Sequence, residues 1–456
     1  MSELPDVLIR GERSRLFPVL ADTSKEGRTL SILLACIESV EEFGRALVSE
    51  LGIKIGSRSK LETYTEVVLK RGIDKPHRPD GLIIVSGGGK TWKALVEAKV
   101  GNSDVTIEQL DAYLEIAKIN NIDALITISN VYAPLPSHYP TQLSAASLKK
   151  ASIFHWSLMH ILTQATLHLN NGEVSDREQR IILNEMVRFL SHASAGVRSF
   201  DQMPQAWNEI TATVQSGASV SPRSLGTLDV VGAWYQEICD LALILSRQLG
   251  EEVQLKVPRA HVIEPSARMK ADAETLATKN CLMATYKIPN TAGDVSVVAD
   301  IHKRSIFVSM RLGAPADRKS TRARVSWLLR QLQKSNADGI FIRLFWPGRG
   351  SFTQHALSLL RDAPERAEES GKVVTSFEVV YVRDLATRFA QRRNFIADLE
   401  QIVPVFYDQV GQHLKVWQPP APTLKEELRD PSEVSTEALQ EEAEEIASNR
   451  AIPSST

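Results

Sequence analysis

Hydrophobic residues in the first part of the chain follow two different periods, one typical of helices and one typical of strands. Across residues 30–51, apolar residues recur every three or four positions, which predicts a helix. Residues 61–69 (LETYTEVVL) alternate with a period of two and predict a strand. Two further strands, residues 81–86 (GLIIVS) and 93–100 (KALVEAKV), flank the sequence GGGK, whose glycines suit a tight hairpin turn.

The hydrophobic pattern predicts further helices and strands toward the middle of the chain. Residues 106–121 predict a helix, whereas 123–130 and 152–157 predict short apolar strands. Residues 159–169 and 176–192 predict two helices that close this first unit. The expected fold is therefore α/β, with the order helix, three strands, helix, strand, strand, and a helical extension.

A change in composition predicts further parts of the chain. Residues 193–226 are rich in serine and glycine and read as a helix followed by a linker. A long helix, strands, a basic helix, more strands and a last helix then predict an α+β domain. From about residue 418, proline and glutamate dominate, which predicts a disordered acidic tail. The predicted parts are a first domain (1–195), a linker (196–227), a second domain (228–417) and the tail (418–456).

Composition narrows the class of protein. The 456 residues are enough for two or three domains, and no apolar run reaches the roughly 18–20 residues of a membrane span. The N-terminal sequence MSELPDVLIRGERSRLF has charged residues where a signal peptide would have an uninterrupted apolar core. Cys36, Cys239 and Cys281 are too few and too scattered for a disulfide framework or a paired-cysteine zinc site. A cytoplasmic protein is expected, without a membrane.

The net charge of -2 conceals an uneven distribution. Residues 424–445 contain nine acidic residues and only two basic ones. Without this surplus of seven negative charges, the remainder would carry about +5, so a nucleic-acid partner stays compatible with the composition.

Three charged residues interrupt the apolar hairpin: Asp80 before its first strand, and Glu97 and Lys99 on its second. Buried charges are costly unless they are paired or bind a metal. Glu97 and Lys99 are two positions apart, so their side chains share one face of the strand, and antiparallel pairing can bring Asp80 beside them. The two carboxylates and the Ala98 carbonyl would suit Mg²⁺, with Lys99 beside the water that attacks a phosphodiester.

This pattern resembles the PD-(D/E)XK nuclease superfamily. Pro79 and Asp80 match its PD element, Glu97-Ala98-Lys99 match its (D/E)XK element, and the predicted element order resembles its αβββαβ core. In the following helix, QLDAY is similar to the QxxxY motif of the RecB-like branch, which implies that Gln109 and Tyr113 organise DNA and the active-site lysine.

The resemblance implies a Mg²⁺-dependent deoxyribonuclease, with Mn²⁺ as a substitute, that serves in defence against foreign DNA or in DNA maintenance. Asp80 and Glu97 would bind the metal. Members of the family often add an acidic ligand from the first helix, and Glu42 is favoured here. The other candidates for this ligand are Glu38, Glu41 and Glu66.

Positively charged residues other than Lys99 are candidates for contact with nucleic acid. Lys90 and Lys93 lie at the hairpin tip, but GGGK lacks the GxxxxGK[ST] spacing of a phosphate loop. Four more basic residues surround the start of the predicted basic helix, where backbone N–H groups favour anions. A solvated surface that binds no ligand explains these four residues equally well. These four are Arg318, Lys319, Arg322 and Arg324.

Each candidate also has an interpretation without catalysis. Asp80 in Pro-Asp-Gly suits a turn, and Glu97 with Lys99 would form a solvated ion pair on an exposed edge strand. Gln109 and Tyr113 fit simple surface and core positions. The alternative function is a non-catalytic nuclease-like module for DNA binding or assembly, or a structural protein that contacts RNA through the second domain. The second domain could also recruit a protein partner or form a homo-oligomer.

Overall fold

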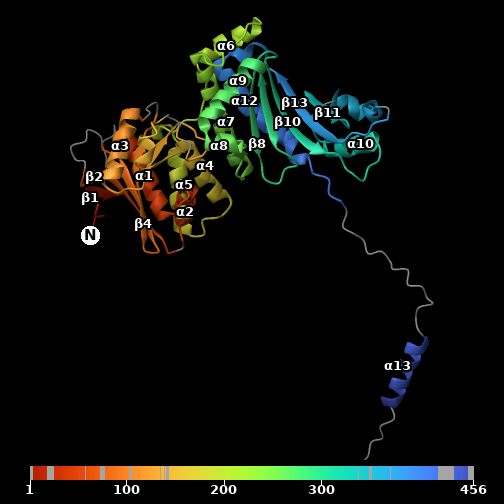
Figure 1. Ribbon diagram of the computed structural model, residues 1–456, viewed down its shortest axis with the longest axis horizontal. Helices are drawn as coiled ribbons and strands as arrows, with labels where there is room; N and C mark the ends of the chain where they lie inside the picture. Colours follow the sequence, from red (N-terminus) through yellow and green to blue (C-terminus); the bar gives the residue numbers. More distant parts are fainter. Residues whose placement is uncertain are drawn as a thin grey trace, which may run out of the picture. The chain divides into compact units, whose positions relative to one another are not determined.

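The computed structural model contains two compact units, Met1–Trp417 and Gln418–Thr456. The first unit holds two separate β-sheets with helices around them, so the chain is mixed α/β, as predicted (Figure 1). Among the described residues, no helix is both long and apolar enough to cross a membrane. The structure describes residues 4–17, 25–56, 58–71, 78–101, 105–133, 135–137, 139, 143–336, 338–348, 352–369, 371–419 and 436–449.

The first sheet has six strands in the order β1-β2-β3-β4-β5-β6. Neighbours from β1 to β4 pair antiparallel, and β4, β5 and β6 pair parallel. The predicted order of helix, three strands, helix, strand, strand is observed from α1 to β6, with one added strand in front. The strands are β1 (Leu8–Arg13), β2 (Lys60–Leu69), β3 (Gly81–Gly87), β4 (Lys90–Ala98), β5 (Ala124–Ser129) and β6 (Ser152–Ser157).

Helices cover both faces of this sheet. Alternation along the strands sends Ile83 and Val96 toward the core formed with α1, α2, α4 and α5, and sends Leu82 and Leu95 toward α3. Thr106 and Gln109 form a capping box that begins α3. The helices are α1 (Lys25–Ser39), α2 (Glu41–Glu50), α3 (Ile107–Ile119), α4 (Leu158–Asn170) and α5 (Arg177–Leu190).

The helix predicted over residues 30–51 is in fact two helices. The backbone is extended at Val40 (φ -106°, ψ 97°), between α1 and α2. Gly44 packs so closely against α1 that an added Cβ would lie 2.0 Å from the carbonyl oxygen of Ile37. Any larger residue at position 44 would therefore push the two helices apart.

The second sheet is antiparallel and has seven strands in the order β12-β11-β13-β10-β9-β8-β7. Alternate residues of β10, such as Ile306 and Val308, enter the hydrophobic core of this region. The strands are β7 (Gln254–Leu255), β8 (Cys281–Lys287), β9 (Val295–Asp300), β10 (Ser305–Gly313), β11 (Ile340–Phe345), β12 (Phe352–Ala356) and β13 (Ser376–Asp384).

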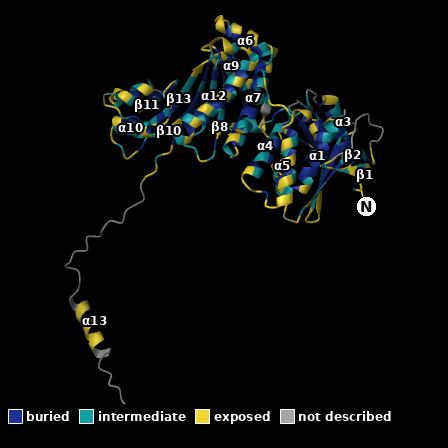
Figure 2. Cartoon of the chain, turned by 180° about the vertical axis from the view of Figure 1, so that it is seen from behind, coloured by how far each residue is buried: buried dark blue, intermediate teal, exposed yellow. Residues whose placement is uncertain are grey.

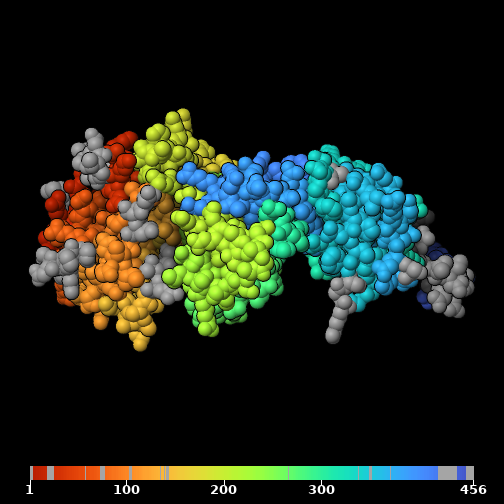
Figure 3. All heavy atoms as spheres, turned by 90° about the horizontal axis from the view of Figure 1, so that it is seen from above, coloured from red at the N-terminus to blue at the C-terminus, as the bar shows by residue number. Residues whose placement is uncertain are grey.

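Helix α6 belongs to the core of this second region, although it lies within the predicted linker. Its Trp207 packs against Phe389 and Phe395, with ring centroids 5.4 and 4.7 Å apart. The Trp207 indole donates to the carbonyl of Phe389, 182 residues away. On the surface, Figure 3 shows yellow-green atoms from the chain around residue 200 beside blue atoms from its C-terminal part. The helices are α6 (Ala206–Gln215), α7 (Leu225–Leu249), α8 (Arg259–Ile263), α9 (Pro265–Lys279), α10 (Thr321–Gln331), α11 (Leu357–Asp362) and α12 (Arg392–Gln409).

The two regions of the first unit meet through helices. Helix α4 packs against α7, and Arg247 Nη1 donates to Thr163 Oγ1 at 2.5 Å. The backbone N–H of Tyr132 donates to Gln236 Oε1 at 2.7 Å. Figure 2 shows buried residues concentrated in the strands and on the inward faces of these helices.

The acidic tail is helical in part. Thr436–Asn449 forms α13, which corrects the prediction of disorder for these residues. Its sequence is rich in alanine and glutamate, which favour helix, and its described side chains are exposed. The rest of that prediction, residues 420–435 and 450–456, lies outside the described residues.

Candidate active site

The site is built on the β3–β4 hairpin. Gly88 and Gly89 adopt positive φ (58° and 76°) in its turn, a conformation that favours glycine. The register pairs Gly81 with Val96, which sets Asp80 beside the strand end that carries Glu97. Asp80 Oδ2 accepts a hydrogen bond of 3.0 Å from the backbone N–H of Ala98. The hairpin thus joins the PD and EAK segments as the sequence predicted.

Asp80, which is half-buried, and Glu97, which is buried, form a pair of acids. The Glu97 side chain is only 2% exposed. Glu97 Oε1 lies 2.8 Å from Lys99 Nζ, whereas its Oε2 is buried and has no hydrogen-bond partner among the described residues. Burial and the neighbouring negative charge of Glu97 raise the pKa of Asp80. Two ionised carboxylates are unfavourable in this arrangement unless positive charge, from Lys99 or from a bound cation, offsets their repulsion.

Lys99 is held between two carboxylates. Its Nζ contacts Glu97 and also lies 3.5 Å from Glu26 Oε2, at the start of α1. Burial by itself would lower the pKa of Lys99, but the hydrogen bond and charge of Glu97, with Asp80 and Glu26, raise it overall. Lys99 therefore keeps its positive charge in this site.

The two residues of the QLDAY motif have different environments. Tyr113 is 2% exposed and donates to the carbonyl oxygen of Arg78 at 3.2 Å, which fixes the chain before Asp80. Burial and the charge of Glu97 raise the pKa of Tyr113. Gln109 instead caps α3, where its Oε1 accepts from the Thr106 N–H at 3.2 Å. Tyr113 thus lies at the site, and Gln109 has a structural role in the helix cap.

The carboxylate pair fits a hard divalent cation. Glu97 offers a buried oxygen without a partner among the described residues, and the hairpin register sets the Asp80 carboxylate beside the strand end that carries Glu97. Among the described residues, no group of three or more histidine, cysteine, aspartate or glutamate side chains could hold a metal ion. Mg²⁺ is usually bound by one or two carboxylates and retains several waters, so two acids suffice for it.

The acidic residue that α1 brings to the site is Glu26, not the favoured Glu42. Glu42 lies on α2, where its Oε1 accepts from Ser175 Oγ at 3.2 Å. Glu38 accepts from Thr63 and pairs with Arg13, which accounts for its carboxylate. Glu26 is not among the residues predicted from the sequence, because the predicted helix begins at residue 30, whereas α1 begins at Lys25.

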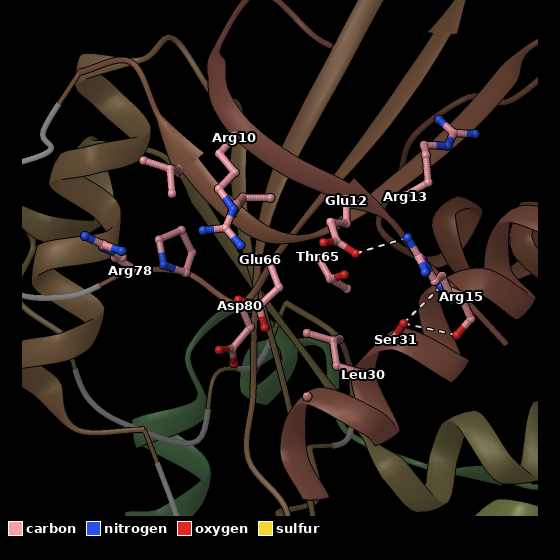
Figure 4. A pocket seen from close by; sticks show the side chains of 14 residues that line it. Arg10, Glu12, Arg13, Arg15, Leu30, Ser31, Thr65, Glu66, Arg78 and Asp80 are labelled. Carbon is pink, nitrogen blue, oxygen red and sulfur yellow. Dashed lines mark hydrogen bonds and ion pairs between the residues drawn. The ribbon is translucent and has the colours of Figure 1, made fainter. Parts of the chain in front are cut away.

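Glu41, the remaining first-helix candidate, forms an exposed ion pair with Arg45 at 2.8 Å. Glu66, the candidate from the first predicted strand, lies next to Asp80. Its backbone has φ 53° at a register shift between β1 and β2, and its N–H donates to the Asp80 carbonyl at 3.2 Å. Figure 4 shows the Glu66 and Asp80 carboxylates side by side in one cleft. A left-handed glutamate is a strained feature that often accompanies a functional site.

The hairpin-tip lysines lie far from this site. Lys90 begins β4, seven positions before Glu97, and a strand advances about 3.3 Å per residue, so the two are roughly 23 Å apart. The backbone N–H of Lys93 donates to Asp123 Oδ2 at 2.8 Å. Lys90 and Lys93 are thus not brought to the carboxylates.

The basic residues at the start of α10 also divide into two groups. Arg324 donates to the carbonyls of Arg318 and Val374 (2.8 and 2.6 Å), so it holds the start of α10 in place. Arg318 is partly buried, with its Nε 4.0 Å from Asp317. Lys319 and Arg322 are exposed. Two of the four predicted cations are therefore presented to solvent.

The structure brings Asp80, Glu97, Lys99 and Tyr113 together and adds Glu26 and Glu66 beside them. This arrangement sets two carboxylates and a lysine ammonium next to one another. In comparisons with known proteins, no family model, curated protein or solved structure matches this chain.

Proposed function

We propose that the chain is a metal-dependent nuclease that hydrolyses phosphodiester bonds of DNA at the site of Asp80, Glu97 and Lys99. The observation that carries this proposal is the acid pair of half-buried Asp80 and buried Glu97. One Glu97 oxygen has no partner among the described residues, and an ammonium group lies 2.8 Å from the other oxygen. Structural ion pairs do not require a second acid beside them. The resemblance to the PD-(D/E)XK superfamily supports the same reaction.

Asp80 and Glu97 would hold Mg²⁺ or Mn²⁺. The bound cation would supply Lewis-acid stabilisation of the phosphate and a lowered pKa for water. Asp80 is oriented by the Ala98 N–H, and the chain before it by Tyr113. Each acid would therefore meet the cation in a preset position.

Lys99 would stabilise negative charge that develops on the phosphate oxygens. Its raised pKa keeps the ammonium protonated, which fits this electrostatic role and not that of a general base. Glu97 and Glu26 hold the ammonium in place. A role in defence against foreign DNA or in DNA maintenance is an inference by analogy with the superfamily. The rival proposal, a non-catalytic DNA-binding or assembly module, does not explain why both acids and the lysine are present together.

Cleavage assays with Mg²⁺ or Mn²⁺ test the proposal, using plasmid DNA and short single- and double-stranded oligonucleotides. The intact protein is compared with Asp80→Asn and Lys99→Gln, and with Lys54→Gln as a matched control on an exposed lysine. We expect cleavage to fall about 100-fold or more in the two site variants, with unchanged far-UV circular dichroism, and to persist in the control. Cleavage that survives both site changes, or no cleavage of any substrate, would contradict the proposal and favour the non-catalytic module.

A further inference from the structure

Arginines line a cleft beside Asp80. Some of them belong to a strand that comes earlier in the chain than any element predicted from the sequence. Strand β1 contributes Arg10 and Arg13, and Arg78 lies two residues before Asp80. In Figure 4, Arg10 extends toward Glu66 and the Asp80 carboxylate, and Arg78 lines the same cleft. The cleft therefore borders the candidate active site at Asp80, on the β1 side of the sheet.

Two of these guanidinium groups are available for a ligand. Arg10 and Arg78 are exposed, and neither side chain forms an ion pair or hydrogen bond with another described residue. Arg13 differs, because it pairs with Glu38 and Glu62 and lies over the Tyr64 ring.

The fourth arginine of the cleft, Arg15, also stabilises the fold. Arg15 pairs with Glu12 at 3.3 Å, and its backbone N–H donates to Ser31 Oγ at 3.0 Å. The cleft thus combines two arginines that stabilise the protein itself with two that have no partner within the described structure.

We propose that Arg10 and Arg78 bind phosphate groups of a nucleic-acid strand that flank the bond cleaved at Asp80. This inference rests on the proposed nuclease function and deepens it by assigning a substrate subsite. Guanidinium groups match the geometry of phosphate oxygens and bind them with two hydrogen bonds. Since phosphate contacts carry no direct base information, this subsite positions the strand without reading its sequence.

The acids of the cleft add a condition to this binding. Glu66 and Asp80 face the same space as the two arginines, so their charges oppose a phosphate until a cation neutralises them. The backbone N–H of Glu66 donates a hydrogen bond to the Asp80 carbonyl. The left-handed backbone at Glu66 therefore helps to hold both acids in the cleft. Strand binding at this subsite is therefore strengthened by a divalent cation.

Fluorescence anisotropy with labelled single- and double-stranded oligonucleotides tests the subsite, in EDTA and in Ca²⁺, with gels to confirm that the strands stay intact. The full chain is compared with Arg10→Gln and Arg78→Gln. The matched control is Arg58→Gln, an exposed arginine just before β2, at the end of the sheet opposite Asp80. Each variant loses one positive charge, so a general charge effect would be equal in all three.

We expect Arg10→Gln and Arg78→Gln each to weaken binding in Ca²⁺ about tenfold, and Arg58→Gln to bind like the intact protein. Each of these two substitutions should also reduce the slope of log affinity against log salt concentration by about 0.7–0.9. Equal affinities for all three variants, or no binding by the intact protein, would overturn the subsite. Binding of inorganic phosphate as tightly as the strand would overturn it too, because the cleft would then be a site for free phosphate and the rest of the strand would contribute nothing.

This experiment separates the subsite from the nuclease proposal. Arginine-dependent binding by a protein that cleaves nothing would support the subsite and contradict the nuclease function. Cleavage of DNA, combined with binding that does not depend on Arg10 and Arg78, would support the nuclease function and contradict the subsite.

Discussion

Replacing Asp80 by asparagine should stabilise the folded protein at alkaline pH, although it removes an acid of the candidate active site. Burial and the charge of Glu97 raise the pKa of Asp80 from 3.8 to about 7. The folded state therefore binds more protons than the unfolded state between these values, and the free energy of unfolding falls as the pH rises through this window. Asparagine removes the repulsion and still offers an oxygen to the Ala98 N–H.

The size of this effect follows from the displaced pKa. One pH unit corresponds to about 1.4 kcal/mol, so a change from 3.8 to about 7 corresponds to at most about 4 kcal/mol. The gain from Asp80→Asn should be small near pH 4, grow with pH and become constant above about pH 7. Mg²⁺ should reduce the difference, because it would bind and stabilise the intact folded site but not the variant.

Urea unfolding followed by tryptophan fluorescence, at pH 5 and pH 8.5 and with EDTA or Mg²⁺, measures these differences. Asp229→Asn, at an exposed position of α7, is the matched control and should behave like the intact protein at both pH values. A variant that is no more stable than the intact protein at pH 8.5, or equally stabilised at both pH values, would refute the reasoning. The two acids would then not repel each other in the folded state.

Three further changes test other parts of the structure. Glu26→Gln removes a carboxylate 3.5 Å from the Lys99 ammonium and should reduce the cleavage rate about tenfold without changing the urea midpoint; an unchanged rate would remove Glu26 from the site. Glu42→Gln should leave cleavage unchanged, because its carboxylate faces Ser175, and a large loss of rate would contradict that placement. Trp207→Ala should cost about 3–5 kcal/mol of unfolding free energy, measured in urea, because the ring is fully buried; a cost below about 1 kcal/mol would mean that α6 is not part of the core.

The hairpin of the candidate site could be predicted because its signals are local. Apolar runs on both sides of Gly88 and Gly89 define two strands and their turn, and the period of two fixes the shared face of Glu97 and Lys99. The position of Asp80 follows from the same register. Helix α3 could be predicted from the apolar period of its sequence.

The residues that the sequence did not reveal depend on contacts distant along the chain. Strand β1 (LIRGER) buries only Leu8, so it shows no alternating apolar pattern, and it pairs with a strand about fifty residues later. The left-handed backbone at Glu66 has no local signal, because glutamate rarely adopts it. The sequence favours Glu42 because it predicts one continuous helix over residues 30–51, whereas the interruption at Val40 places Glu42 on α2.

The central claim, phosphodiester hydrolysis by Asp80, Glu97 and Lys99, is tested most directly by single-turnover cleavage. Protein in excess over end-labelled DNA is mixed with Mn²⁺, and the product of the intact chain is compared with that of Lys99→Gln. The account predicts product from the intact protein and a rate about 100-fold or more lower in the variant, with Mn²⁺ binding retained by both in calorimetry. Equal rates, or no product from the intact protein, would contradict it.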